Sequence, residues 1–242
     1  MRLSPHCRAL TGFAYVPPWT VNAGFVWGSE RTLIVDTGPT ALAAATIVGY
    51  AEVARPGNTL LAINTERHLD HMAGNDFVRQ AGMDVYGHPS ILRNDEEYAV
   101  DIEAYCACVS DSSRRADGEG RIPFRGTRIA NPNVPVDAEM TMDLGGVKAD
   151  ILLLPGHTPA NLAVWVAAEG VLFSGDTIVS DYRPNLGSGG PPDWSLWMTA
   201  LARIEGLRPA ILVPGHGRVL CGAQITGEIV RIRSFLEAAL AQ

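Results

Sequence analysis

The chain has 242 residues, of which 47% are apolar and 19% are charged, and its formal net charge is −7. These values are typical of a globular protein and exclude a disordered one. The negative charge argues against nucleic acid as a partner, and no run of about 18 apolar residues predicts a membrane span.

Buried strands alternate with helices in the first part of the chain. Each apolar run of strand length ends in a polar or glycine-containing turn, and a helical pattern follows it. The pattern predicts strands at 31–38, 58–65 and 83–88, and helices at 39–54, 72–82 and 89–105.

A polar stretch rich in Gly, Pro and Arg interrupts this alternation at 106–135. Loops of this length in compact domains are typically functional, so we interpret it as a substrate-lid insertion within a single domain spanning 1–242. The strands then resume. The pattern predicts strands at 148–156, 161–170, 171–180 and 209–217, and helices at 193–207, with Asp193 as its cap, and at 222–241. The resulting fold class is α/β.

The four cysteines show no C-x-x-C spacing and no dense framework. They indicate reduced thiols, and the N-terminus has no apolar leader segment. We therefore expect a cytoplasmic protein that acts on a small molecule, with no nucleic-acid or membrane partner. The sequence does not predict its oligomeric state.

One short stretch, "NTERHLDHMAGNDFV", concentrates acids and imidazoles directly after a predicted buried strand. Alternate residues of an extended loop point to one side, so neighbouring members of this cluster can face a common point. Further along, "LLLPGH", "VLFSGD" and "ILVPGH" each place a polar side chain at or near a strand end, where sites are commonly built. The set comprises Glu66, His68, Asp70, His71, His157, Asp176 and His216.

Three acids and four histidines would be costly to bury without partners. A pair of metal ions gives all seven a common partner. His6 and His88 stand outside this pattern, and we interpret them as ordinary histidines.

The motifs "ERHLDH", "PGHTPAN", "FSGDT" and "VPGHG" resemble the signature of the metallo-β-lactamase superfamily, H-x-H-x-D-H followed by a histidine, a bridging aspartate and a last histidine. The resemblance implies a four-layer αββα sandwich with the metals at one sheet edge. It also implies the ligand sets. The first site would be Glu66, His68 and His157, the second would be Asp70, His71 and His216, and Asp176 would bridge them.

Glu66 departs from the signature, because the family has a histidine at this position. Carboxylate oxygen is an accepted zinc ligand. Three carboxylates on two divalent ions leave a formal charge of about +1, so the centre is a weaker Lewis acid than usual. We expect two zinc ions, with the first site the weaker; the harder oxygen donor leaves iron or manganese open.

Such a centre predicts a metal-dependent hydrolase, in which metal-activated water attacks an ester, thioester, lactone or amide carbonyl of a small molecule. Asp70 would orient that water or receive a proton. Tyr182 and Asn185 follow Asp176 by a short loop and are candidate oxyanion donors.

Three alternatives stay open. Asn185 lies in an "N-L-G" phrase that resembles two-zinc β-lactamases, but those enzymes are exported and have a cysteine where this chain has Asp176. An iron-dependent sulfur dioxygenase of the same fold is a second alternative. The third is a catalytically impaired metal-binding member, with Glu66 as the cause.

Overall fold

The computed structural model describes residues 1–14, 19–107 and 119–241. Its strands join in one sheet of twelve, in the order β6-β5-β4-β3-β2-β11-β10-β9-β8-β7, with β1 beside β2 and β12 beside β11. The N-terminal half of the sheet contains β1 (Cys7–Ala14), β2 (Thr20–Trp27), β3 (Arg31–Val35), β4 (Thr59–Ile63), β5 (Val85–Gly87) and β6 (Val134–Pro135). The C-terminal half contains β7 (Met140–Asp143), β8 (Lys148–Leu153), β9 (Leu162–Val166), β10 (Val171–Val179), β11 (Ile211–His216) and β12 (Leu220–Cys221).

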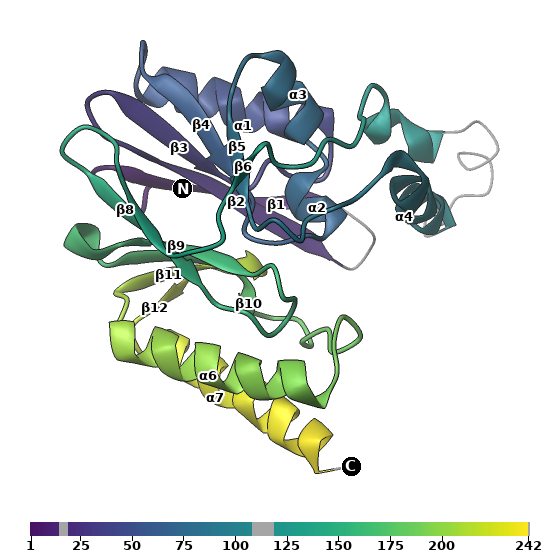
Figure 1. Ribbon diagram of the computed structural model, residues 1–242, viewed down its shortest axis with the longest axis vertical. Coiled ribbons are helices and arrows are strands. Elements are labelled where there is room, and N and C mark those ends of the chain that lie inside the picture. Colours follow the sequence, from purple (N-terminus) through teal and green to yellow (C-terminus); the bar gives the residue numbers. More distant parts are fainter. Residues whose placement is uncertain (15–18, 108–118, 242) are drawn as a thin grey trace.

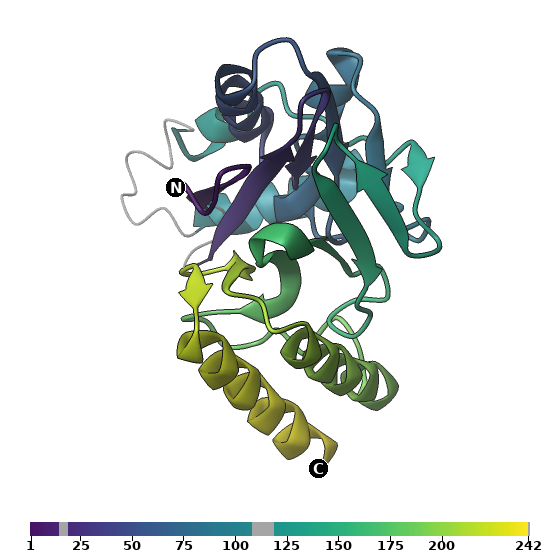
Figure 2. The same ribbon diagram turned by 90° about the vertical axis from the view of Figure 1, so that its left-hand side faces the viewer.

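The two halves meet along β2 and β11, which are antiparallel and pair at His216 and Val21. Strands β3, β4, β5 and β6 run parallel to one another, and β10 is parallel to β11; the remaining strand pairs are antiparallel. The sheet curls at this seam, so that its two halves face each other (Figures 1 and 2).

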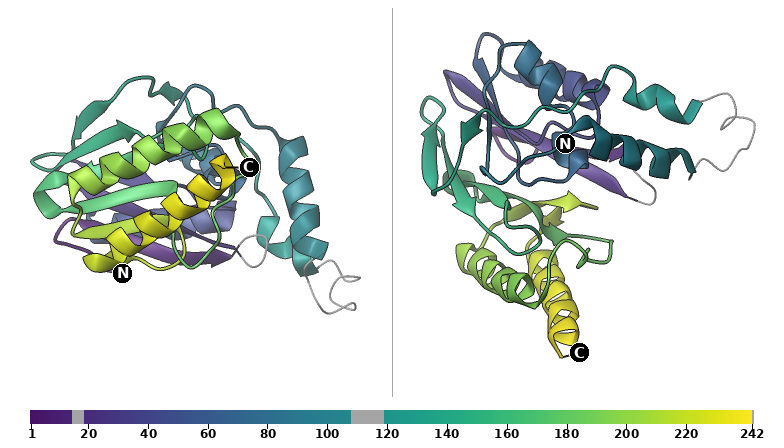
Figure 3. Two further views of the ribbon diagram at one scale, coloured as in Figure 1. Left: turned by 90° about the horizontal axis from the view of Figure 1, so that it is seen from below. Right: turned by 45° about the vertical axis from the view of Figure 1, so that its right-hand side comes forward.

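Three apolar clusters fill the interfaces between successive layers of helices and sheet. One joins the facing sides of the two halves and includes Leu33, Ile63, Ile151 and Val164. A second packs α1 (Ala41–Ala54) against the outer side of the N-terminal half. The third packs α6 (Pro191–Leu207) and α7 (Ala223–Leu240) against the outer side of the C-terminal half, as Figure 3 shows from below. The predicted four-layer αββα sandwich is confirmed.

Most of the predicted elements are present. The sequence pattern did not predict β1 and β2 at the start of the chain, nor the short strands β6, β7 and β12. Strand β1 pairs irregularly with β2 between Leu10 and Phe13, and it is half exposed. Its apolar pattern is therefore broken. Strand β7 has only four residues, too few to establish a period.

Helix α6 begins earlier than predicted. Its cap is Gly190, and Asp193 is the third residue of the helix rather than the cap. The Asp193 carboxylate accepts a hydrogen bond from the Gly190 backbone N–H at 2.9 Å. The two prolines at 191 and 192 explain the earlier start, because proline fits the first turn of a helix.

The interruption at 106–135 begins at the end of α4 (Asp95–Ala107), which stands out from the body (Figures 1 and 3). The short helix η1 (Glu119–Phe124) packs on α4, and Phe124 and Tyr98 join a cluster with Leu69 of α2 (Leu69–Met72). Residues 108–118 lie outside the described residues, so the lid interpretation stays a prediction. In the described part of the chain, no helix combines the length and apolar character needed to cross a membrane.

Candidate metal centre

Four segments supply the seven predicted residues. Glu66 and His68 follow β4, and Asp70 and His71 lie in α2, whose N-cap is His68. The other three come from the C-terminal half: His157 from the loop after β8, Asp176 from β10, and His216 from the end of β11. The structure brings all seven together in two groups, namely Glu66, His68, His157 and Asp176, and Asp70, His71 and His216.

One placement differs from the sequence interpretation. Asp176 lies inside β10, not at its end. The pairing of β10 with β11 is irregular between Phe173 and Val179, and Gly175 within this stretch has a φ of 50°. A Cβ on Gly175 would lie 2.5 Å from the Thr65 hydroxyl, so only glycine fits there. This irregularity marks the point in a buried strand where a carboxylate joins the centre.

The first group is compact. The Nε2 atom of His157 lies 3.2 Å from Nδ1 of His68 and 3.5 Å from an oxygen of both Glu66 and Asp176. The Glu66 side chain is fully buried, whereas that of His68 is 27% exposed. His68 therefore lies where the group opens to solvent.

The second group shares Asp176 with the first. The Nε2 atom of His216 lies 3.1 Å from one Asp176 oxygen and 3.4 Å from an Asp70 oxygen. The Nε2 atom of His71 lies 3.3 Å from the other Asp176 oxygen and 3.8 Å from Asp70. Asp176 thus faces both groups.

These donor separations fit divalent cations. Two donors bound tetrahedrally at about 2.1 Å lie roughly 3.4 Å apart, which is close to the separations found here. Three buried donor atoms, Glu66 Oε2, His71 Nε2 and Asp176 Oδ1, also have no hydrogen-bond partner among the described residues. Unsatisfied buried polar atoms are costly, and cations at the two groups would satisfy all three.

Each of the four imidazoles forms a hydrogen bond through the ring nitrogen that does not face the donor group. Nδ1 of His71 bonds Asp36 at 2.9 Å. Nδ1 of His216 donates to the Thr20 carbonyl at 2.8 Å, and Nδ1 of His157 donates to the Asn185 carbonyl at 3.2 Å. For His68 the roles are reversed, because its Nε2 bonds the Ser188 hydroxyl at 3.0 Å and its Nδ1 faces the group. Such contacts fix the orientation of metal-binding histidines.

Sequence reasoning missed three of these partners: Asp36, the Thr20 carbonyl and Ser188. Asp36 carried a signal, because it follows the buried strand "TLIV" and is itself a buried acid. A backbone carbonyl carries no sequence signal. Ser188 lies in the glycine-rich stretch "NLGSGG", where a serine is common and does not by itself indicate a site.

Charge and burial oppose each other at this centre. Burial alone would lower the pKa of His216, but Asp176 and Asp70 raise it to about 9. Burial also acts against protonation of His71, yet the same carboxylates raise its pKa well above the usual value. Despite its own burial, Asp176 has a pKa held well below its usual range by His216 and His71. Burial dominates at His157 and lowers its pKa.

The two Pro-Gly-His phrases need glycine for steric reasons. A Cβ on Gly215 would lie 1.8 Å from an Asp176 oxygen, and one on Gly156 would lie 2.4 Å from the Trp197 backbone. In each phrase, glycine therefore lets a neighbouring element approach the histidine that follows it.

A cavity of about 580 Å³ opens over the donors. Trp19, Arg93, Asp101 and Asn185 line it together with four of the seven residues. Tyr182 lines a different hollow, and its hydroxyl lies 3.3 Å from that of Thr20. Of the two predicted oxyanion donors, the structure therefore places Asn185 at the cavity and directs the Tyr182 hydroxyl toward Thr20.

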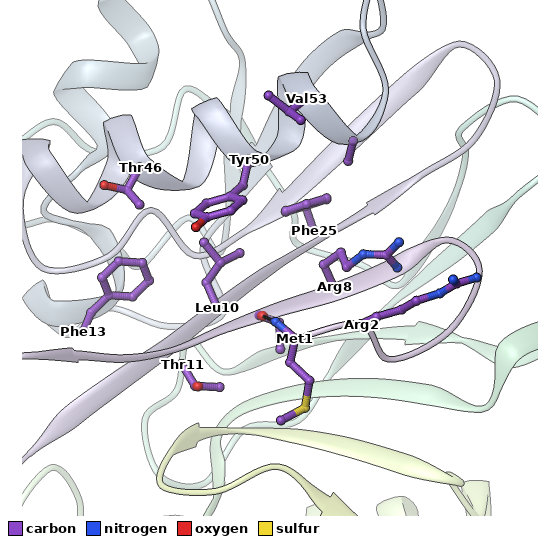
Figure 4. A pocket seen from close by; sticks show the side chains of 12 residues that line it. Met1, Arg2, Arg8, Leu10, Thr11, Phe13, Phe25, Thr46, Tyr50 and Val53 are labelled. Atoms are coloured by element: carbon purple, nitrogen blue, oxygen red, sulfur yellow. Dashed lines mark hydrogen bonds between the residues drawn. The ribbon is translucent and has the colours of Figure 1, made fainter.

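A larger cavity, of about 670 Å³, lies between β1, β2 and α1 (Figure 4). Its lining includes Leu10, Phe25, Tyr50 and the two arginines Arg2 and Arg8, with no acid or histidine. Its lining therefore offers no carboxylate or imidazole to hold a cation, whereas the smaller cavity has both.

Comparisons with known proteins agree with this geometry. The family model described as "Metallo-beta-lactamase superfamily" matches residues 16–216. A hydroxyacylglutathione hydrolase of Rhodospirillum rubrum is 27% identical over 68% of this chain and 48% of its own length. An acyl-coenzyme A thioesterase of Gallus gallus is 26% identical over 65% of this chain and 57% of its own. The chain thus matches about half the length of these curated relatives.

Among solved structures, a metallo-beta-lactamase family protein from Thermus thermophilus has a TM-score of 0.71. It is 20% identical and covers 98% of this chain and 81% of its own. At this identity the likeness supports the fold alone.

Proposed function

The chain belongs to the metallo-beta-lactamase superfamily, and from that membership we propose that it is a metal-dependent hydrolase of small acyl compounds, with thioesters as the leading substrate class. The observation that carries the proposal is the convergence of seven donors in two adjacent groups at the floor of an open cavity. The relatives named as hydroxyacylglutathione hydrolase and acyl-coenzyme A thioesterase support the substrate class.

The residues of the two groups would hold two divalent cations, most simply zinc. Bound there, the cations would polarise the scissile carbonyl and lower the pKa of water. Iron and manganese are compatible with the oxygen-rich donor set, so metal identity belongs to the test.

Within the chain, we assign the handling of the proton to Asp70. Its side chain is 9% exposed, lines the cavity and contacts His216 at 3.4 Å, so one oxygen can face a water molecule while the other faces the donor group. It would orient the attacking water and accept its proton, and then return that proton to the leaving group.

Of the two candidate oxyanion donors, we assign the role to Asn185. It lines the cavity, its carbonyl holds His157, and its side-chain oxygen accepts the Gly187 N–H at 2.9 Å. The oxygen is thereby fixed. One N–H of the amide donates to the Ser188 hydroxyl at 3.5 Å, and the other is the donor that would meet a developing oxyanion. Trp19 adds an apolar wall, with its ring 5.2 Å from that of His216.

Turnover of a substrate panel by metal-loaded protein tests the proposal. The panel contains a hydroxyacylglutathione, a short acyl-coenzyme A, a lactone, an aryl ester and nitrocefin, and chelator-treated protein is the control. Metal-dependent release of thiol from the first two supports a thioesterase. Turnover of nitrocefin alone would replace the proposal with β-lactam hydrolysis. Oxygen uptake by iron-loaded protein would indicate a dioxygenase, and no turnover at all would indicate an impaired member.

A further inference from the structure

The two carboxylate oxygens of Glu66 face different groups of donors. Its Oε2 lies 3.5 Å from Nε2 of His157, in the first group. Its Oε1 lies 3.3 Å from Nε2 of His71, in the second. Both oxygens lie 3.0 Å from Nδ1 of His68. Glu66 therefore contacts donors of both groups from a fully buried position.

Asp176 also lies between His71 and His157, although its oxygen near His157 is at the same time 3.1 Å from Nε2 of His216. One of its oxygens lies 3.3 Å from His71 and the other 3.5 Å from His157. These separations match those of Glu66, so each carboxylate directs one oxygen to His71 and the other to His157. Glu66 Oε2 and Asp176 Oδ1 also share the lack of a hydrogen-bond partner within the described residues.

An imidazole at position 66 could not do this, because it offers one nitrogen to a cation while the other carries its proton. A carboxylate offers two oxygens that can bind two ions. The change from histidine to glutamate therefore alters the connection between the two sites as well as the charge of one of them.

We propose that Glu66 is a second bridging carboxylate, which binds both cations as Asp176 does, and not a ligand of the first cation alone. This inference rests on the metal centre of the proposed function. Its consequence is coupling: an ion in either site orients Glu66 and so favours binding of an ion in the other, by the same factor in both directions.

The direct test is a crystal structure of the metal-loaded protein with anomalous maps at the metal edge. The expected result is one Glu66 oxygen within about 2.3 Å of each ion. Both oxygens on a single ion, or a Glu66 side chain turned away from the second ion, would overturn the proposal.

A titration tests the same point in solution. The variant His157→Ala disables the first site, and Mn²⁺ binding to the remaining site is followed by electron paramagnetic resonance. Adding Glu66→Gln to this variant should weaken the remaining site about tenfold, because Gln keeps the shape but offers the cation a neutral carbonyl oxygen in place of a charged carboxylate oxygen. Unchanged affinity would contradict the bridge.

Glu228→Gln in the same background is the matched control, since Glu228 is a buried glutamate that pairs with Arg231 on α7. It should leave Mn²⁺ affinity unchanged, and circular dichroism verifies folding of each variant. Both readouts are independent of turnover. If Glu66 binds both ions but the protein hydrolyses no substrate, only the proposed function is refuted. If the protein is a hydrolase but Glu66 binds a single ion, only the bridging role is refuted.

Discussion

Asp36 at the end of β3 accepts a hydrogen bond from Nδ1 of His71 at 2.9 Å, and both side chains are buried. The same carboxylate accepts the backbone N–H and the hydroxyl of Thr65, each at 2.7 Å. Asp36 therefore positions the loop that carries Glu66. It also orients the imidazole of His71, which faces Glu66 and Asp176.

Replacing Asp36 by Asn should weaken cation binding by roughly 10- to 100-fold, because the amide is a poorer acceptor for the His71 N–H. Asn is the suitable variant, since Asp36 has a φ of 61°, which Asn tolerates better than Ala. Competition with a chromophoric chelator measures the affinity. Asp84→Asn, at an exposed acid, is the control and should bind as the native chain does. Native-like affinity of the Asp36 variant would mean that its contact with His71 is incidental.

The variant Gly215→Ala should lose most of its cation affinity, because the added Cβ would collide with the Asp176 carboxylate. Gly227→Ala is the matched control, since a Cβ at this helical position meets nothing within 4 Å. That control should be more stable by about 0.5–1 kcal/mol. Metal content after dialysis and thermal melting check both. Full metal occupancy in the Gly215 variant would show that Asp176 can shift without cost.

Stability of the metal-free protein should fall as pH rises from about 7 to 10. The pKa of His216 is raised to about 9 in the folded protein from roughly 6.5 in the unfolded chain. Its contribution to stability is therefore complete below the unfolded value and is lost as pH passes through about 9. Asp176, whose pKa is lowered, contributes above its usual value and loses this contribution as pH falls.

Differential scanning fluorimetry across this range measures the effect, with metal-loaded protein in parallel. The loaded protein should show no loss between pH 7 and 9, because a cation takes the place of the proton on His216. Parallel pH profiles for the two forms would contradict this account.

Trp197 of α6 connects the outer helical layer to the centre. Its side chain is 1% exposed, its ring lies 5.1 Å from that of His157, and its indole N–H donates to the Thr177 carbonyl at 2.8 Å. Trp197→Ala should destabilise the metal-free fold by roughly 3–5 kcal/mol. Leu196→Ala, at a side chain that is 49% exposed, should change stability by less than about 0.5 kcal/mol. Chemical denaturation compares the two, and equal losses would mean that Trp197 is not part of the packed core.

The elements that consist of an apolar run with clear boundary residues were predictable from sequence. Helix α1 is an example: an apolar helical run follows Thr40, whose hydroxyl accepts the Ala43 N–H at 3.0 Å as an N-cap. Strand β1 was not predictable, because its pairing shifts within a half-exposed strand and breaks the alternation on which a prediction depends.

At the site, the chemical type of each donor was predictable, because residue type and spacing are properties of the sequence. The position of Asp176 inside a strand was not, since it depends on an irregular pairing with β11. Nor was the dual contact of Glu66. Alternation along an extended loop predicts the side to which a side chain points, but the partner of each oxygen depends on how the two halves of the sheet meet.

The seam between β2 and β11 has a consequence for the integrity of the chain. Neither half carries a full donor set, because Glu66 and His71 come from one side of the seam and His157 and His216 from the other. An ion bound by donors from both halves would hold the halves together. Association of the two halves and binding of the ion should therefore promote each other. Two fragments divided between the exposed residues Asp137 and Ala138 should complement each other better with a divalent ion than with a chelator, which makes this scaffold a starting point for an ion-gated split reporter.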